Sequence, residues 1–467
     1  MRPSACDRCH TVRSRCLPGP GETCYRCYRL HYTCTYSRRR QRPGRKPRVA
    51  SVAASASMKD RDDISPTSDT SLGFTVEATH GPENSELTTT NVPQIELPRL
   101  LRWESSMSRV SEYTAVEICK FFSFGESLSR EMSQIIRARI KEAPMLLLDP
   151  YVAVSRVLLR STTNQPACSD GDWSSCAAAL QALRNAQVTI PEHAGYILSL
   201  GLSLVTFHRL ISGISASTIC RYTLSLIRPL YDSEQLQESD MRELLCLVFL
   251  DITESLFRAR IPVIQYRVRD PYLVNHHAGL CGSLLPLLYR VCLLGAAIRR
   301  GSQLPASPDY FDRLRKEIIA WVPSVSGATI ERFSEKEMLL LLTQANLHRN
   351  ATLLILHRLR FPFGERDDDA ELLSQTIIRE MQHCLARTKQ HPPNISLVLL
   401  VAGAEVQDSV GRENILSLLQ SIKGSGFYPF VANLRLFLSR VWTSRDEGTT
   451  RYLFHLFDTD DNLSIPL

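Results

Sequence analysis

The sequence predicts two unlike domains: a small irregular one with two short helices at the N-terminus, and a large all-α one in the C-terminal part of the chain. Six of the 14 cysteines fall within the first 34 residues. Positive charge is concentrated there too, because residues 1–50 hold 13 Arg or Lys against two acidic residues, for a formal +11, whereas the whole 467-residue chain carries +7. From about residue 108 onward, apolar side chains recur at helical spacing.

The N-terminal cysteines form two copies of one spacing, two residues and then six, joined by seven. Two such triads of thiols indicate metal rather than a redox pair. Two separate four-sulfur zinc sites need eight thiolates, so six satisfy two zinc ions only if two sulfurs bridge. Metal would also stabilise a segment that has too little aliphatic core to fold alone. The expected ligands of two zinc ions are Cys6, Cys9, Cys16, Cys24, Cys27 and Cys34.

Two other interpretations of these cysteines remain open. A disulfide scaffold is disfavoured, because no apolar signal segment precedes Cys6 and a basic tail follows Cys34. A cross-brace of the RING or LIM type would use His10 and His31 as further ligands. Because six cysteines are already present, we expect both histidines to lie at the surface.

The first triad lies in ACDRCHTVRSRC and the second in CYRCYRLHYTC. These segments resemble the fungal binuclear zinc-cluster transcription factors. The resemblance implies that Cys6 and Cys24 bridge the two zinc ions. It further implies that one tetrahedron is completed by Cys9 and Cys16, and the other by Cys27 and Cys34.

The resemblance also implies which side chains contact double-stranded DNA. The spacing between the second and third cysteines leaves room for a helix of about two turns over residues 7–15, and in the family the C-terminal end of this helix points into the major groove. The family places a basic base-reading residue three positions before the third cysteine, which here is Arg13. Arginine donates bidentately to guanine, so a CG-rich half-site such as CGG or TCG is expected, with a plain phosphate contact as the alternative. The expected phosphate contacts are Arg8, Arg15, Arg26 and Arg29, and the next candidates for base reading are His10 and Arg15.

A basic tail follows the last cysteine. It is expected to serve nuclear import, binding of the DNA backbone, or both. The stretch Pro43–Arg48 also resembles a degenerate AT-hook, an arm that lies in the minor groove, and this remains the alternative. The basic residues of the tail are Arg38, Arg39, Arg40, Arg42, Arg45, Lys46 and Arg48.

Composition sets the expected domain bounds. Residues 49–107 are rich in Ser, Thr, Asp, Ala and Pro, which predicts a disordered linker. No heptad repeat occurs there, so a homodimer would have to form through the C-terminal domain. The expected bounds are 1–37 for the zinc-cluster DNA-binding domain, 38–48 for the basic tail, 49–107 for the linker and 108–467 for the all-helical domain.

Periodicity and capping signals predict individual helices in the C-terminal domain. One apolar face, which ends before Pro144, combines Leu128, Met132, Ile135, Ile136 and Ile140. Two further helices are predicted from N-terminal capping boxes, one at Ser334 and Glu337 that runs to Leu359, and one at Asp240 and Glu243 that ends before Pro262. The apolar stretches AGYILSLGLSLVTF and GLCGSLLPLLYRVCLLGAAI are expected to be core helices and not membrane spans.

Five segments of this domain, in their order along the chain, resemble the fungal-specific regulatory domain that accompanies such zinc clusters. They are LVFLDITESLFRARIP, HAGLCGSLLPLLYRVC, ATLLILHRLRFPFG, LLVAGAEV and VWTSRDEG. No GxGxxG, GxSxG, HExxH or phosphate loop occurs, so an enzyme is not expected. The adjacent His276 and His277 are expected to point in different directions and not to bind metal, and Cys281 and Cys292 are expected to be core thiols.

These observations predict a nuclear, zinc-dependent, sequence-specific transcription factor of the RNA polymerase II type. It would bind double-stranded DNA and the transcription machinery or co-regulators, and no membrane. The cluster and the basic tail resemble those of regulators of secondary-metabolite gene clusters. This resemblance suggests activation of fungal secondary-metabolite or other metabolic genes. One alternative is a zinc cross-brace interaction module attached to a helical ligand-binding domain. Another is a helical ligand-binding or catalytic protein with an incidental zinc module.

Overall fold

The computed structural model describes the chain in several stretches, and the chain divides into two compact units, Met1–Thr90 and Asn91–Leu467. The described stretches are 6–7, 23–24, 27, 33–35, 109–119, 122–160, 168–211, 216–301, 308–421, 428–448 and 450–458. The expected basic tail, 38–48, and the expected linker, 49–107, therefore lie outside the described residues.

The larger unit is all-α, as the sequence predicts. Its described residues contain no strand, and an isolated bridge between Asn275 and Gly279 closes a turn. Residues 109–119 are helical. The helices that follow are α4 (Glu126–Glu142), α5 (Pro144–Arg160), α6 (Asp170–Asn185), η1 (Pro191–His193), α7 (Ala194–Ile211), α8 (Ala216–Asp232), η2 (Glu238–Asp240), α9 (Met241–Arg258), η3 (Cys281–Leu284), α10 (Leu285–Arg299), α11 (Pro308–Ala320), α12 (Gly327–Arg332), α13 (Glu335–Arg360), α14 (Asp367–Thr388), α15 (Ser396–Glu405), α16 (Ser409–Gln420), α17 (Tyr428–Asp446) and α18 (His455–Asp458).

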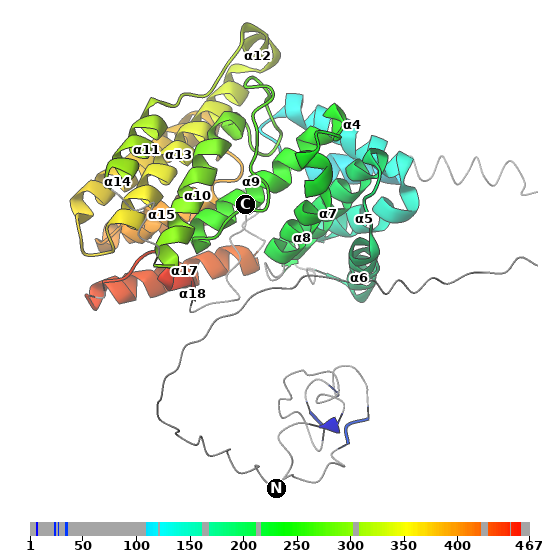
Figure 1. Cartoon of the computed structure of the whole chain (residues 1–467), viewed down its shortest axis with the longest axis horizontal. Helices are drawn as coiled ribbons and strands as arrows, with labels where there is room; N and C mark the ends of the chain where they lie inside the picture. The colour runs from blue at the N-terminus through cyan, green and yellow to red at the C-terminus, as the bar shows by residue number, and fades with distance from the viewer. Residues whose placement is uncertain are drawn as a thin grey trace, which may run out of the picture. The chain divides into compact units, whose positions relative to one another are not determined.

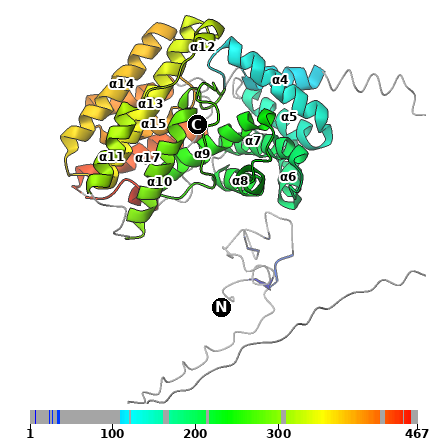
Figure 2. The same ribbon diagram turned by 45° about the horizontal axis from the view of Figure 1, so that its top comes forward.

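Helix α9 lies between two groups of helices in this unit. Helices α4 to α8 lie on one side of it, and α11, α13, α14 and α15 lie on the other (Figure 1), an arrangement that a tilted view also shows (Figure 2). Helix α9 packs on α7, α8 and α10, and every residue of it except Arg242 is buried. A helix that is buried on all sides forms the core of a large helical domain.

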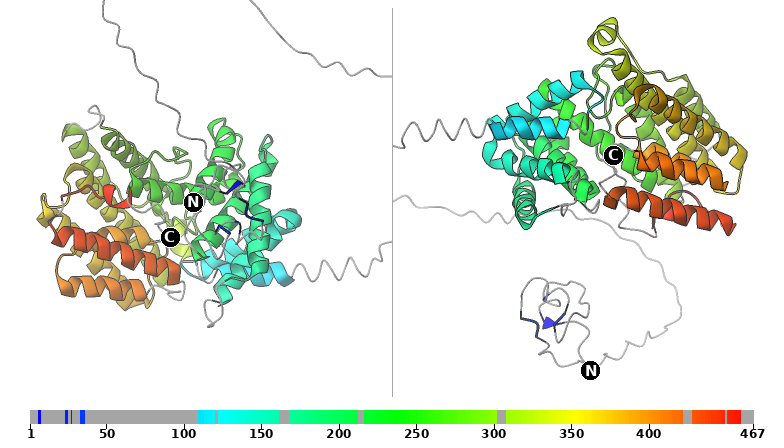
Figure 3. Two further views of the ribbon diagram at one scale, coloured as in Figure 1. Left: turned by 90° about the horizontal axis from the view of Figure 1, so that it is seen from below. Right: turned by 180° about the vertical axis from the view of Figure 1, so that it is seen from behind.

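Helix α17 packs against α15 and α16, and in the view from behind it lies beside the orange helices (Figure 3). Trp442 of α17 donates its indole N–H to the carbonyl oxygen of Gly403 at 2.8 Å. A Cβ at Gly403 would lie 3.0 Å from Ile415 and 3.2 Å from Leu438, so glycine allows the three helices to approach closely at this point.

The predicted capping box of α13 and the predicted apolar face of α4 are confirmed. The Ser334 Oγ accepts from the Glu337 backbone N–H at 3.3 Å, and the Glu337 carboxylate accepts from the Ser334 N–H at 3.0 Å. Glu337 also accepts from the backbone N–H of Ser127 at 2.9 Å, which joins the start of α4 to the start of α13. The apolar face of α4 is buried at Leu128, Met132, Ile136 and Ile140 and half-buried at Ile135.

The predicted capping box at Asp240 is wrong, although α9 begins and ends where the sequence predicts. Asp240 has helical dihedral angles, φ −87° and ψ −15°, and its side chain makes no capping hydrogen bond. Asp240 and Glu243 are buried and bind Arg139 of α4 instead, at 2.5 Å and 2.9 Å. A buried carboxylate without a counter-ion costs more free energy than a helix end without a side-chain cap. The preceding turn η2 can take the place of that cap.

Two helical segments are long and apolar enough to cross a membrane by length and composition, namely Pro191–Ile211 and Cys281–Arg299. Most of each apolar window is buried inside the unit. Buried core helices pass the same test of length and composition, and core helices are what the sequence predicts for both segments.

Candidate functional site

Four cysteines converge in the N-terminal unit. The Sγ atoms of Cys6, Cys24, Cys27 and Cys34 all lie within 4.8 Å of one another. The Cys6 Sγ is 3.7 Å from the Cys24 Sγ and 3.8 Å from the Cys27 Sγ. Sulfurs bound tetrahedrally to one zinc ion at about 2.3 Å are about 3.8 Å apart, whereas a disulfide needs about 2.05 Å. These four residues could therefore hold a metal ion.

The four cysteines are largely enclosed, and backbone groups donate hydrogen bonds to their sulfurs. Cys6, Cys24 and Cys27 are buried and Cys34 is half-buried. Backbone N–H groups donate to two of the sulfurs, from Cys24 to the Cys34 Sγ at 3.2 Å and from Cys27 to the Cys24 Sγ at 3.4 Å. Burial, together with the neighbouring thiol of Cys24, raises the pKa of Cys27 to about 11. A bound cation is what would favour the thiolate form there.

These four cysteines are the set that the resemblance assigns to one tetrahedron, which contains both bridging residues. Asp7 and Cys27 are helical, and the Asp7 N–H donates to the Thr35 carbonyl at 2.9 Å, which links the start of the cluster to its end. The other predicted site residues lie outside the described residues, namely Cys9, Cys16, Arg8, His10, Arg13, Arg15, Arg26, Arg29, Arg38, Arg39, Arg40, Arg42, Arg45, Lys46 and Arg48.

The helical unit contains a small cavity of ≈ 40 Å³ among the 109–119 helix, α4, α5, α7 and α9. Such a volume accommodates a few water molecules and is too small for a metabolite. Its apolar side is formed by Ile118, Phe122, Met132, Ile135, Ile136, Val154 and Leu202, and its polar side by Tyr151, Ser203, Thr206, Glu243, His276 and His277.

Both His276 and His277, which the sequence predicts to point in different directions, line this cavity. The prediction assumed a helix or an extended chain, whereas the two residues lie in a turn whose backbone N–H groups bind the side chain of Asn275. The His276 Nε2 lies 3.3 Å from the Cys246 Sγ. Burial and the charge of Arg242 lower the pKa of His276 to about 4. Burial, the neighbouring His276 and Arg209 lower the pKa of His277 well below its usual value.

Within the described residues, the cysteine cluster is the one group of three or more His, Cys, Asp or Glu side chains with the geometry to hold a metal ion. Cys281 and Cys292 are fully buried thiols, as predicted.

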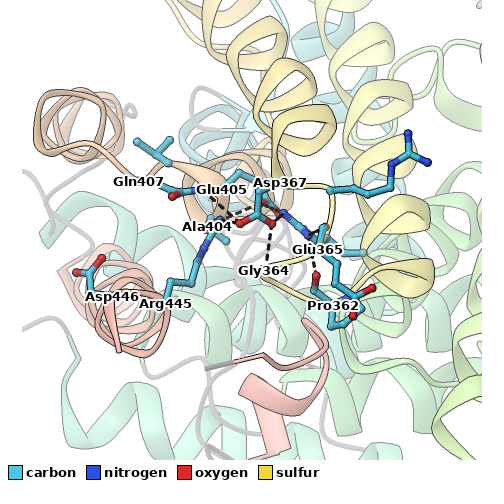
Figure 4. Close-up of polar contacts among 12 residues, drawn as sticks. Pro362, Gly364, Glu365, Asp367, Ala404, Glu405, Gln407, Arg445 and Asp446 are labelled. Carbon is cyan, nitrogen blue, oxygen red and sulfur yellow. Dashed lines mark hydrogen bonds and ion pairs between the residues drawn. The ribbon is translucent and has the colours of Figure 1, made fainter. Parts of the chain in front are cut away.

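A buried ion network joins four helices of the unit (Figure 4). Arg358 of α13 uses all five of its N–H donors, on the carboxylates of Glu405 (2.8 and 2.6 Å) and Asp367 (2.8 Å) and on the carbonyls of Pro362 (3.0 Å) and Glu365 (3.1 Å). Burial opposes the charge on Arg358, but the two carboxylates raise the pKa of its guanidinium.

Arg445 of α17 completes this network. It donates to Glu405 and Asp367, at 3.0 Å each, and to the carbonyl of Ala404 at 2.7 Å. Both guanidinium groups lie 4.8 Å from the ring centre of Phe363. Two arginines thus balance two carboxylates, and the satisfied hydrogen bonds indicate a structural role.

No pattern in the sequence indicates this network, although three of the segments that carry the resemblance contain its members. Arg358 lies in ATLLILHRLRFPFG, Glu405 in LLVAGAEV and Arg445 in VWTSRDEG. A single charged residue within or beside an apolar run is the signal that could have indicated such a network. A charge that cannot reach water needs a partner of opposite charge.

The comparisons with known proteins identify the helical region. Residues 118–461, most of the chain, match the fungal specific transcription factor domain. The comparison with curated proteins and the comparison with solved structures each found no match. A transcription factor domain is in keeping with a protein that is not an enzyme and that acts in transcription regulation. The chain therefore belongs to the fungal specific transcription factor domain family.

Proposed function

We propose that this protein is a zinc-dependent, sequence-specific DNA-binding transcription factor. The observation that carries the proposal is the convergence of four cysteines, at the spacing of zinc-bound sulfurs, within the most basic part of the chain. The rest of the chain belongs to a transcription factor family. A compact basic segment provides the electrostatic attraction that DNA backbone requires.

The proposed zinc centre has a structural role. Cys6 and Cys24 would bridge two zinc ions, with Cys27 and Cys34 on one of them and the remaining pair, Cys9 and Cys16, on the other. Zinc supplies the folding free energy of a segment without an apolar core, so metal removal would unfold it. The meeting of four thiols supports an all-cysteine ligand set over a cross-brace with histidine ligands.

The proposed DNA interface separates base reading from backbone binding. Arg13 would donate to guanine in a CG-rich half-site, while Arg8, Arg15, Arg26 and Arg29 would bind phosphates and set the register. The arginines of the basic tail, from Arg38 onward, would add backbone contacts and direct the protein to the nucleus.

The helical unit would transmit the regulatory signal. It would contact the transcription machinery or co-regulators, and it would form any homodimer, since the linker carries no heptad repeat. The proposed targets are fungal secondary-metabolite or other metabolic genes, activated from the bound half-site.

We expect Arg13→Ala to weaken binding to the preferred duplex by about 1–3 kcal/mol and to leave binding to scrambled DNA nearly unchanged. The triple change of Arg38, Arg39 and Arg40 to Ala should weaken binding to both duplexes and reduce the salt slope by about 0.9 for each phosphate that is no longer neutralised. The measurement is fluorescence anisotropy with full-length protein at several salt concentrations, on a duplex selected from a random library. Equal losses of affinity on both duplexes for Arg13→Ala would make Arg13 a phosphate-binding residue.

A further inference from the structure

A surface cleft lined by arginines lies where α9 and α10 both end. Its volume is ≈ 480 Å³, and its side chains are those of Arg221, Arg260, Arg299 and Arg300, beside Ala259 and Ile261. Among the described residues, no acidic side chain lines it. The volume is in the usual range for small-molecule sites. We propose that this cleft binds a small molecule that carries a phosphate group.

Two buried carboxylates near the cleft bind arginines, although one oxygen of Glu254 has no hydrogen-bond partner among the described residues. Asp251 accepts from Arg221 at 2.6 Å, and Glu254 accepts from the Nε of Arg258 at 3.0 Å. Both carboxylates are buried, whereas the cleft has four lining arginines and the charge of Arg258 also acts on Arg260. The two acids therefore leave a net positive charge at this surface.

The ends of the two helices account for part of this charge. Cations stabilise helix C-termini, where carbonyl oxygens lack partners. Arg299 donates to the carbonyl of Arg258 at 2.6 Å, and Arg221 donates to the carbonyl of Ile261 at 3.2 Å. The guanidinium groups of Arg260 and Arg300, by contrast, form no hydrogen bond or ion pair with another described residue, and both residues are exposed. Their planar sets of donors match phosphate oxygens.

The backbone fixes the position of Arg260 relative to α10. Ala259 ends α9 in the left-handed conformation, φ 47° and ψ 54°, and its N–H donates to the Ser255 carbonyl. A Cβ at Gly295 of α10 would lie 3.4 Å from the Cβ of Ala259, so the end of α9 packs directly on α10 one turn before Arg299. This packing brings the free guanidinium of Arg260 to the same cleft as that of Arg300.

The like charges around Arg260 favour a dianion over a single carboxylate. Partial desolvation at the cleft and the charges of Arg258, Arg221 and Arg299 lower the pKa of Arg260, and the charge of Glu254 opposes them only in part. A phosphate monoester carries a charge of about −1.5 to −2 and three acceptor oxygens, which several guanidinium groups can share. A carboxylate carries only about half of the charge of a phosphate monoester, or slightly more than half. A concave site of this size also suits a small molecule better than the convex backbone of a duplex.

The test uses the full-length chain, glycerol 2-phosphate as the probe and a buffer without phosphate. The cleft variant is Arg260→Gln with Arg300→Gln. The matched control is Arg267→Gln with Arg366→Gln, which removes the same charge from two exposed ion pairs elsewhere on the unit. Thermal melting is followed at constant ionic strength, with glycerol plus sodium chloride as the blank. Wild type and control should show a saturable rise in the melting temperature. The cleft variant should bind the probe at least about tenfold more weakly.

Three results would overturn the proposal. The first is an equal rise in melting temperature for all three proteins, and the second is a rise that the blank reproduces. The third is a cleft variant that loses affinity for duplex DNA but not for glycerol 2-phosphate. The last result would assign the arginines to the DNA interface. Binding of DNA by the cleft variant without the probe should equal that of wild type, so the test stays separate from the proposed role of the cysteine cluster.

Discussion

Replacing Arg358 by Met should destabilise the helical unit by about 3–5 kcal/mol, because the change leaves the buried carboxylate of Glu405 and the half-buried one of Asp367 without their main counter-ion. Arg358 and Glu405 are 0% and 1% exposed, so water cannot take the place of the missing guanidinium. Methionine retains most of the side-chain volume, and the destabilisation then reports the missing charge and hydrogen bonds rather than a cavity. The remaining partner, Arg445, has to serve both Glu405 and Asp367.

The measurement is urea denaturation followed by circular dichroism at the helical band. The control is Arg360→Met, two residues further along α13, which removes an ion pair to Asp312 in which both side chains are partly exposed (32% and 55%). Exposed pairs contribute about 0–1 kcal/mol, so the control should stay close to wild type. Similar midpoints for the two variants would show that the buried network does not stabilise the unit.

Replacing Cys24 by Ala should abolish zinc binding and reduce specific DNA affinity at least about a thousandfold, to the non-specific level. The proposed bridging sulfur belongs to both tetrahedra, so its removal takes a ligand from each zinc ion. Cys24 is buried within the cluster, and its Sγ lies 3.7 Å from the Sγ of Cys6, the other sulfur that we propose to bridge.

The control for this change is Cys168→Ser, a half-buried thiol of the helical unit that lies outside the cluster. It should retain the zinc content and the DNA affinity of wild type. Elemental analysis and anisotropy on the same preparations give both quantities. A Cys24→Ala protein that keeps its zinc and its preferred-site affinity would remove Cys24 from the metal centre.

Local signals in the sequence predicted local structure well. The apolar face of α4 and the capping box at Ser334 depend on residues within a few turns of one another, and both are confirmed. Asp240 carries the same kind of signal, yet Arg139, about a hundred residues earlier, binds it. A single sequence does not show which of these two partners a carboxylate takes.

Turns and contacts between distant parts of the chain explain what the sequence could not predict. His276 and His277 line one cavity because Asn275 forms a turn there, and a turn is not visible in apolar periodicity. The arginine cleft combines residues from α8, from the end of α9 and from the end of α10. In the N-terminal unit, the repeated spacing indicated a cluster, and four of its six cysteines, Cys6, Cys24, Cys27 and Cys34, do converge.

The most direct measurement is the zinc content of the purified full-length protein, by elemental analysis after gel filtration in metal-free buffer. Six cysteines that share two bridging sulfurs should hold two zinc ions per chain. Chelation of both ions should release the protein from its preferred duplex. A preparation that binds the duplex specifically with one zinc ion per chain, or with none, would contradict the proposed binuclear centre.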